Sequence, residues 1–110
     1  MKLATYDYGD GAGPGLVDGE CIRDLRSIAP AVVGLLGQLD VVAGKATHYP
    51  QVPLVRERLL ASIPSPQRLL GIGLNYRGHA RETGREPGPV PTVFAKLPGA
   101  ITRPYGEVRH

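Results

Sequence analysis

The sequence of 110 residues has little cysteine and no long apolar stretch, and each absence excludes a class of protein. Because Cys21 is the single cysteine, neither an internal disulfide nor a cysteine-based structural zinc site can form. No stretch approaches the roughly 20 apolar residues of a membrane-spanning helix, and the first residues lack the apolar core of a signal peptide. We therefore expect no membrane association and a cytoplasmic location.

The sequence also lacks runs of like charge. Its net charge of +3 comes from scattered arginines, so nucleic-acid binding would rest on net charge alone and is not expected. Glycine and proline are abundant, with 15 and 11 copies, which is typical of a chain with many turns. A hydrophobic content of 42% nevertheless argues against disorder.

The first 25 residues predict a small antiparallel meander of three strands. Alternating apolar residues indicate a strand over residues 2–8, followed by a flexible glycine-rich turn at 9–15. A second extended run leads to Asp18-Gly19, a pair that favours a type I′ hairpin turn. A third strand is expected over residues 20–25.

A helix is expected next, with Ser27 as its cap. Gly34 and Gly37 each weaken it by about 1 kcal/mol relative to alanine, so it must pack on the meander. Residues 41–49 predict a short helix and a loop, whereas residues 54–60 fit either a strand or a short helix. The apolar stripe that predicts the first helix, at i, i+3, i+4 and i+7, consists of Val32, Leu35, Leu36 and Leu39.

The proline-rich segment 63–66 marks a boundary between two domains, because each proline disfavours regular structure at and before its own position. We expect a small N-terminal α+β domain over residues 1–62 and the start of a second domain over 63–110. The second part is expected to hold a buried strand (67–74), a short helix ended by Gly84 (75–83), a loop (86–91) and a strand (92–97). The predicted fold class is α+β.

His79 and Glu82 are the best candidates for chemistry. They are three residues apart, so a helix places them on one face, where a carboxylate can orient an imidazole that acts as a general base. The plainer interpretation is an ordinary polar pair on a solvated helix. A dinucleotide-binding loop at Gly71-Ile72-Gly73 is disfavoured, because Tyr76 stands where the motif requires its third glycine.

Two motifs resemble the fumarylacetoacetate hydrolase family. The first is Gly73-Leu74-Asn75-Tyr76-x-x-His79-x-x-Glu82, and the second is Pro91-x-x-Phe94-x-Lys96-x-Pro98-x-Ala100. Together with the segment 63–66 and the opening meander, the similarity covers nearly the whole chain. It implies the N-terminal portion of a bacterial-type member, with a lid helix that begins an FAH-like β-rich catalytic domain.

The resemblance implies hydrolysis of carbon–carbon bonds, isomerisation or decarboxylation of enol or β-dicarbonyl 2-oxo acids, with Mg²⁺ or another divalent cation. It further implies that His79 activates water or moves a proton, that Glu82 tunes His79, and that Tyr76 and Lys96 lie near the substrate.

The sequence departs from this family in one respect that concerns the metal. The family binds its cation through a Glu-x-Glu pair and a later aspartate, and this sequence contains no Glu-x-Glu. The similarity also fades after Thr102. We therefore expect a truncated member that binds no metal and is inactive alone. The alternative is a non-catalytic interaction module that pairs with itself or with a complementing chain.

Overall fold

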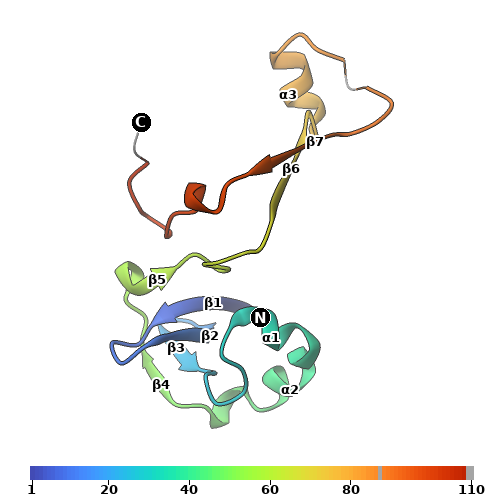
Figure 1. Ribbon diagram of the computed structural model, residues 1–110. Helices are drawn as coiled ribbons and strands as arrows, with labels where there is room; N and C mark the ends of the chain where they lie inside the picture. The colour runs from blue at the N-terminus through green and yellow to red at the C-terminus, as the bar shows by residue number, and fades with distance from the viewer. Residues whose placement is uncertain (87, 109–110) are drawn as a thin grey trace. The chain divides into compact units, whose positions relative to one another are not determined.

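The computed structural model describes residues 1–86 and 88–108, and the chain forms two compact units (Figure 1). The first unit comprises Met1–Pro64 with the segment from Ile101 onward, and the second comprises Ser65–Ala100. Pro87, inside the expected loop, and residues 109–110 lie outside the described residues. The expected domain 1–62 falls inside the first unit, whereas the expected domain 63–110 contributes to both units.

A five-stranded sheet with the order β4-β3-β2-β1-β5 forms the centre of the first unit. Its neighbours are all antiparallel, and β1 to β3 follow one another in the sheet as in the chain, which confirms the meander. The bounds are β1 (Lys2–Asp7), β2 (Ala12–Asp18), β3 (Cys21–Asp24), β4 (Gln51–Pro53) and β5 (Leu59–Leu60), with a 3₁₀ turn, η3 (Arg56–Arg58), between the last two.

Each face of this sheet carries its own apolar cluster. The register of β1 against β2 puts Leu3 and Leu16 on one face and Ala4 and Tyr6 on the other. The first cluster joins the sheet to the helical segment through Leu16, Leu25, Ala29, Leu35 and Val42. The second cluster consists of Ala4, Tyr6 and Ile22, with Tyr8, Val17, Val52, Leu54 and Leu59 packed around it.

β2 begins earlier than the sequence predicts, and two of its glycines lie in close contact with side chains from other segments. A Cβ at Gly13 would overlap the side chain of Arg26, and a Cβ at Gly15 would overlap the side chain of Ile22. The side chains of Arg26 and Ile22 can pack directly against β2 because the glycines at these positions have no Cβ. The expectation of a flexible turn through residue 15 is wrong, since β2 already starts at Ala12.

The hairpin between β2 and β3 is present, but its turn lies one residue later than expected. Asp18 pairs with Cys21, so the two turn residues are Gly19 and Glu20. Gly19 has a φ of +61° and Glu20 has none in the positive range, a pattern of type II′ rather than type I′. Asp18 ends β2, where its Oδ2 accepts a hydrogen bond of 2.8 Å from Nη2 of Arg23.

The single amphipathic helix expected after Ser27 is broken in the structure. Helix begins only at Val32, behind Ala31, and no side chain caps it. Leu35 is fully buried, but the next residue of the expected stripe, Leu36, is 60% exposed. The observed elements are α1 (Val32–Leu35), η1 (Leu36–Gln38), α2 (Leu39–Gly44) and η2 (Ala46–His48), the η elements being 3₁₀ turns.

Glycine explains this break. Gly34 and Gly37 each disfavour helix, and Gly37 lies inside the 3₁₀ turn that separates α1 from α2. The break turns α2 so that Val42, a residue outside the expected stripe, is fully buried. The segment packs against the sheet, as expected, through the shared cluster described above.

The second unit consists of two paired strands joined through a short helix, as Figure 1 shows. Its elements are β6 (Leu69–Gly73), α3 (Arg77–Glu82) and β7 (Thr92–Lys96), and a 3₁₀ turn, η4 (Pro98–Ala100), follows. α3 ends as predicted, because Gly84 adopts a φ of +62°. The N–H of Gly84 donates to the Arg81 carbonyl (3.2 Å) and that of Arg85 to the Ala80 carbonyl (3.1 Å), a Schellman motif.

The expectation that β6 is buried is wrong, because no residue of β6 or β7 is buried and one face of the pair is widely exposed. Leu70 is 62% exposed and Ile72 is 45% exposed. Val93, which pairs with Ile72, is 57% exposed. On the other face the Phe94 ring lies over Gly71, where a Cβ would overlap it. Among the described residues of this unit Ala80 alone is buried, since two strands and one short helix cannot cover both faces.

Antiparallel sheets with separate short helices make the fold α+β, as predicted. Within residues 1–86 and 88–108, no helix combines the length and the apolar character needed to cross a membrane.

Candidate functional site

His79 and Glu82 both lie on α3, and both are exposed. Because they are three residues apart, their side chains leave the helix on the same side. Among the described residues the ion pairs all lie in the first unit, so none joins His79 to Glu82. Thr83 continues this turn by donating its hydroxyl to the His79 carbonyl, at 3.0 Å. The roles of base and partner stay predictions.

Tyr76 and Lys96 lie at different ends of the second unit. Tyr76 immediately precedes α3 in an extended conformation, with its side chain 74% exposed. Lys96 pairs with Leu69 at the start of β6, whereas α3 follows the end of β6. Four residues of strand separate these ends by about 13 Å. The structure thus places Tyr76 beside α3 and leaves Lys96 near Phe94, with its ammonium 5.9 Å from the ring centroid.

An open hollow of about 530 Å³ lies on α3 and the turn that follows it. Helical spacing places Arg77, Ala80 and Arg81 on the side of α3 opposite His79. The hollow therefore does not contain the expected catalytic pair. Its lining consists of Arg77, Ala80, Arg81, Gly84, Arg85 and Glu86, and we call it the arginine hollow.

A smaller hollow of about 190 Å³ lies where β6 ends and β7 begins. Leu74 lines it with a φ of +54°, a left-handed conformation that is uncommon for residues other than glycine. This conformation turns the chain after β6 and leaves Asn75 and Thr92 as polar side chains in the lining. The sequence analysis assigned no role to Asn75. Its place in the lining depends on the left-handed conformation of Leu74, which no local sequence pattern predicts.

The donor set of the described residues does not fit the divalent cation that the family resemblance implies. In residues 1–86 and 88–108, no group of three or more histidine, cysteine, aspartate or glutamate side chains is placed so that it could hold a metal ion. Mg²⁺ needs oxygen ligands in a nearly octahedral array, mostly carboxylates and waters. We therefore assign no chemical step through a metal.

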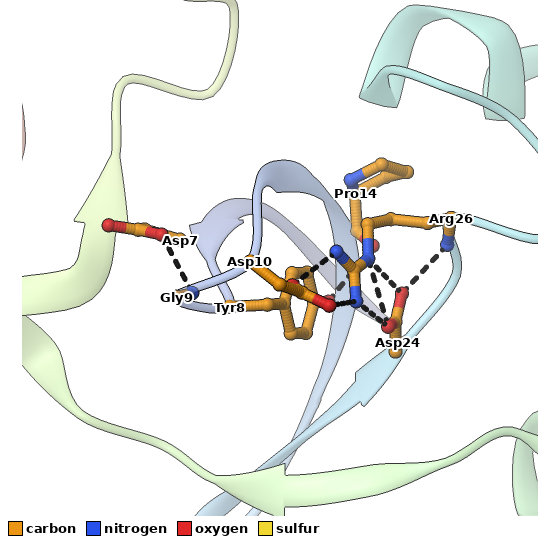
Figure 2. A network of polar contacts seen from close by, with 7 residues as sticks. All are labelled: Asp7, Tyr8, Gly9, Asp10, Pro14, Asp24 and Arg26. Atoms are coloured by element: carbon orange, nitrogen blue, oxygen red, sulfur yellow. Dashed lines mark hydrogen bonds and ion pairs between the residues drawn. The ribbon is translucent and has the colours of Figure 1, made fainter.

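A dense cluster of ionised groups surrounds Arg26 in the first unit (Figure 2). Its guanidinium donates to Asp24 (Nη2–Oδ2, 2.7 Å) and to Asp10 (Nη1–Oδ1, 2.7 Å), and its backbone N–H also donates to Asp24 (2.9 Å). Its Cζ lies 4.3 Å from the centroid of the Tyr8 ring, a cation–π contact. The Tyr8 hydroxyl donates to the Pro14 carbonyl at 3.1 Å.

This cluster shifts the pKa values of its members. Burial, with a further contribution from the charge of Asp24, raises the pKa of Tyr8 to about 12. Burial opposes the charged form of Asp24, but the hydrogen bonds from Arg26 outweigh it and lower the pKa of this carboxyl. The hydrogen bond from Arg26 also lowers the pKa of Asp10, and the two carboxylates raise the pKa of Arg26.

Shifted pKa values often mark functional sites, but the Arg26 cluster lines neither hollow described above. It joins the loop after β1 to the end of β3, so we interpret it as structural. Sequence reasoning missed it for a physical reason. Asp24 and Arg26 are two residues apart, but Asp10 is 16 residues from Arg26, and only the fold brings them together.

The chain is similar to several curated proteins from Burkholderia. It is 33% identical over 108 residues to proteins named "putative hydrolase" from Burkholderia ambifaria strain MC40-6 and Burkholderia multivorans. The match covers 94% of this chain and 38% of each relative, so the chain spans well under half the length of these proteins. No family model matches the chain.

The fold also has a counterpart among solved structures. A putative HpcE protein from Mycobacterium smegmatis superposes with a TM-score of 0.64 at 24% identity, covering 92% of this chain and 38% of that one. This similarity shows a shared fold. The relatives found by sequence and the relative found by fold thus each match nearly the whole of this chain.

Proposed function

We propose that this chain is the N-terminal part of a fumarylacetoacetate hydrolase-like enzyme that acts on enol or β-dicarbonyl 2-oxo acids. The observation that carries the proposal is the pair His79 and Glu82 on one exposed face of α3, directly after β6. The similarity of nearly the whole chain to proteins named as hydrolases supports it. By itself the chain would be inactive, because its described residues offer no metal site.

In this proposal His79 moves the proton that all three candidate reactions require. Hydrolysis, isomerisation and decarboxylation of these acids each transfer a proton to or from water or a carbon next to a carbonyl. Imidazole performs such transfers near neutral pH, and a carboxylate on the same helix face stabilises the imidazolium that forms. Glu82 would supply that carboxylate, and Tyr76, beside the start of α3, would contact the substrate.

A fusion protein tests this proposal. The chain is fused to the segment of the Burkholderia ambifaria relative that lies outside the matched region, and turnover of an acylpyruvate and of oxaloacetate is measured with Mg²⁺. We expect no turnover by the 110-residue chain alone and measurable turnover by the fusion. His79→Gln in the fusion should lower kcat by about 100-fold, the usual contribution of a general base.

Arg68→Gln serves as the control, because Arg68 is an exposed residue of the same unit outside both hollows. Metal-dependent turnover by the chain alone would contradict the proposed inactivity. Full activity of the His79→Gln fusion would contradict the role of His79.

A second candidate function is that of an interaction module. The exposed apolar side chains of Leu70, Ile72 and Val93 share one face of the β6–β7 pair, and such faces favour association. The chain would then pair with itself or with a complementing chain. Light scattering after size-exclusion chromatography should show self-association that Ile72→Lys abolishes and that Val33→Lys, on α1, preserves. A stable monomer at all concentrations would argue against self-pairing.

A further inference from the structure

We propose that the arginine hollow binds a small oxyanion with more than one negative charge, such as a phosphate-bearing or polycarboxylate compound. The hollow lies on the side of α3 opposite His79, so this is a site separate from the one in the proposed function. Neither the family resemblance nor the relatives assign it.

The backbone brings three arginines to the lining of one hollow. Arg77 begins α3, and Arg81 follows one helical turn later. The left-handed Gly84 then reverses the chain, and the hydrogen bond from Arg85 N–H to the Ala80 carbonyl holds Arg85 at the same hollow. The volume of about 530 Å³ falls in the range of pockets that take small ligands.

The charges of the hollow are unbalanced. Within the described residues none of its three arginines forms an ion pair, and Glu86 is the acidic residue in the lining. Three guanidinium groups against one carboxylate leave an excess of positive charge. A bound anion would remove the repulsion among them.

Helix stability does not account for this arrangement. Arg77 and Arg81 are like charges four residues apart, which destabilises a helix. A cation at the first helical residue, where Arg77 lies, also opposes the helix dipole, and only the position of Arg81 near the last turn is favourable. A negatively charged ligand that interacts with all three arginines would offset the repulsion that this arrangement creates.

Guanidinium groups define the class of ligand. Each can donate two parallel hydrogen bonds to a carboxylate or a phosphate, which a single halide ion cannot accept. Three such groups favour a ligand with several charged oxygens. Phosphates and polycarboxylates share this chemistry, so the test uses inorganic pyrophosphate and citrate as separate probes.

The test measures binding to the full 110-residue chain by the shifts of its backbone amide resonances. We expect shifts concentrated at residues 77–86 with one or both probes. Arg81→Gln should weaken binding at least tenfold, Arg81→Lys should weaken it less because the charge remains, and Glu86→Gln should tighten it severalfold. Arg68→Gln, which removes an equal charge outside the hollow, should leave it unchanged.

Several results would overturn the proposal. If Arg68→Gln weakens binding as much as Arg81→Gln, the attraction is general and the hollow is no site. Tighter binding of a short single-stranded RNA, or the absence of shifts with both probes, would also refute it. This test measures binding and needs no turnover. A negative result would therefore leave the proposed role of His79 unaffected, and a loss of that role would leave the anion site unaffected.

Discussion

Arg26 connects parts of the first unit that are separate in the sequence. Its guanidinium reaches Asp10 in the loop after β1 and Asp24 at the end of β3, and it covers the Tyr8 ring. Hydrogen bonds between ionised groups are among the stronger ones in proteins. Here they connect the β1–β2 loop to the segment that follows β3. His79, the residue identified from the sequence, lies exposed on α3 and forms no comparable network with the part of the chain that the structure describes.

Asp24→Asn should lower the free energy of unfolding of the first unit by about 1 kcal/mol. The change removes the charge from an acceptor of hydrogen bonds to Arg26, and partial exposure reduces the effect below that of a buried pair. Urea unfolding followed by circular dichroism measures it. Asp18→Asn is the control, because Asp18 forms an ion pair while 56% exposed and should matter less. Equal effects would contradict this ranking.

Acid should destabilise the first unit through the same carboxylates. The pKa values of Asp10 and Asp24 are lower in the folded chain than their ordinary value, so folding favours the charged forms. Their stabilisation is complete above the ordinary pKa of about 4 and is lost as the pH falls through the lowered values. Urea midpoints between pH 6 and pH 2 should fall more steeply below pH 4 for the wild type than for Asp24→Asn. Parallel curves would argue against this linkage.

The elements differ in how far local sequence explains them. β1 is a strand with Ala4 and Tyr6 on one face, as its sequence predicts, and α3 ends at Gly84 through a motif that needs a left-handed residue. The segment from α1 to α2 has a clear apolar stripe but is broken, because two glycines weaken it, and Leu35 and Val42 are buried in one cluster with Leu16 of the sheet. Competing contacts with the sheet outweighed the periodic pattern there.

Two glycines of the second unit should respond oppositely to alanine. Gly84→Ala should loosen the end of α3 by about 1 kcal/mol, because alanine is strained at a φ of +62°. Gly78→Ala should stabilise α3 by about 0.5 to 1 kcal/mol. Gly78 lies within the helix, and an added Cβ would meet no neighbouring atom. Amide hydrogen exchange of Thr83 and Arg85 reports both changes. The same sign for the two variants would contradict the assigned helix end.

At the scale of the whole molecule, the chain divides its stability unevenly between two units. The first has two apolar clusters with fully buried residues such as Tyr6 and Ile22, whereas the described residues of the second include one buried residue, Ala80. The second unit exposes the apolar side chains of Leu70, Ile72 and Val93, which the proposed interaction module would use for association.

Hydrogen exchange should therefore separate the two units. Amides in β1, β2 and β3 should exchange only through large-scale unfolding, whereas those in β6 and β7 should exchange much faster through local opening. Mass spectrometry of peptides after timed exchange at low protein concentration measures this. Equal protection of β6 and β1 would contradict the division.

The sequence by itself determined what depends on neighbours along the chain. The strand β1, the end of α3 at Gly84 and the common face of His79 and Glu82 all follow from spacings of a few residues. The tertiary structure alone decided the early start of β2 and the cluster around Arg26. Each of these depends on atoms brought together by the folded backbone, and backbone reversals such as those at Leu74 and Gly84 set which side chains meet.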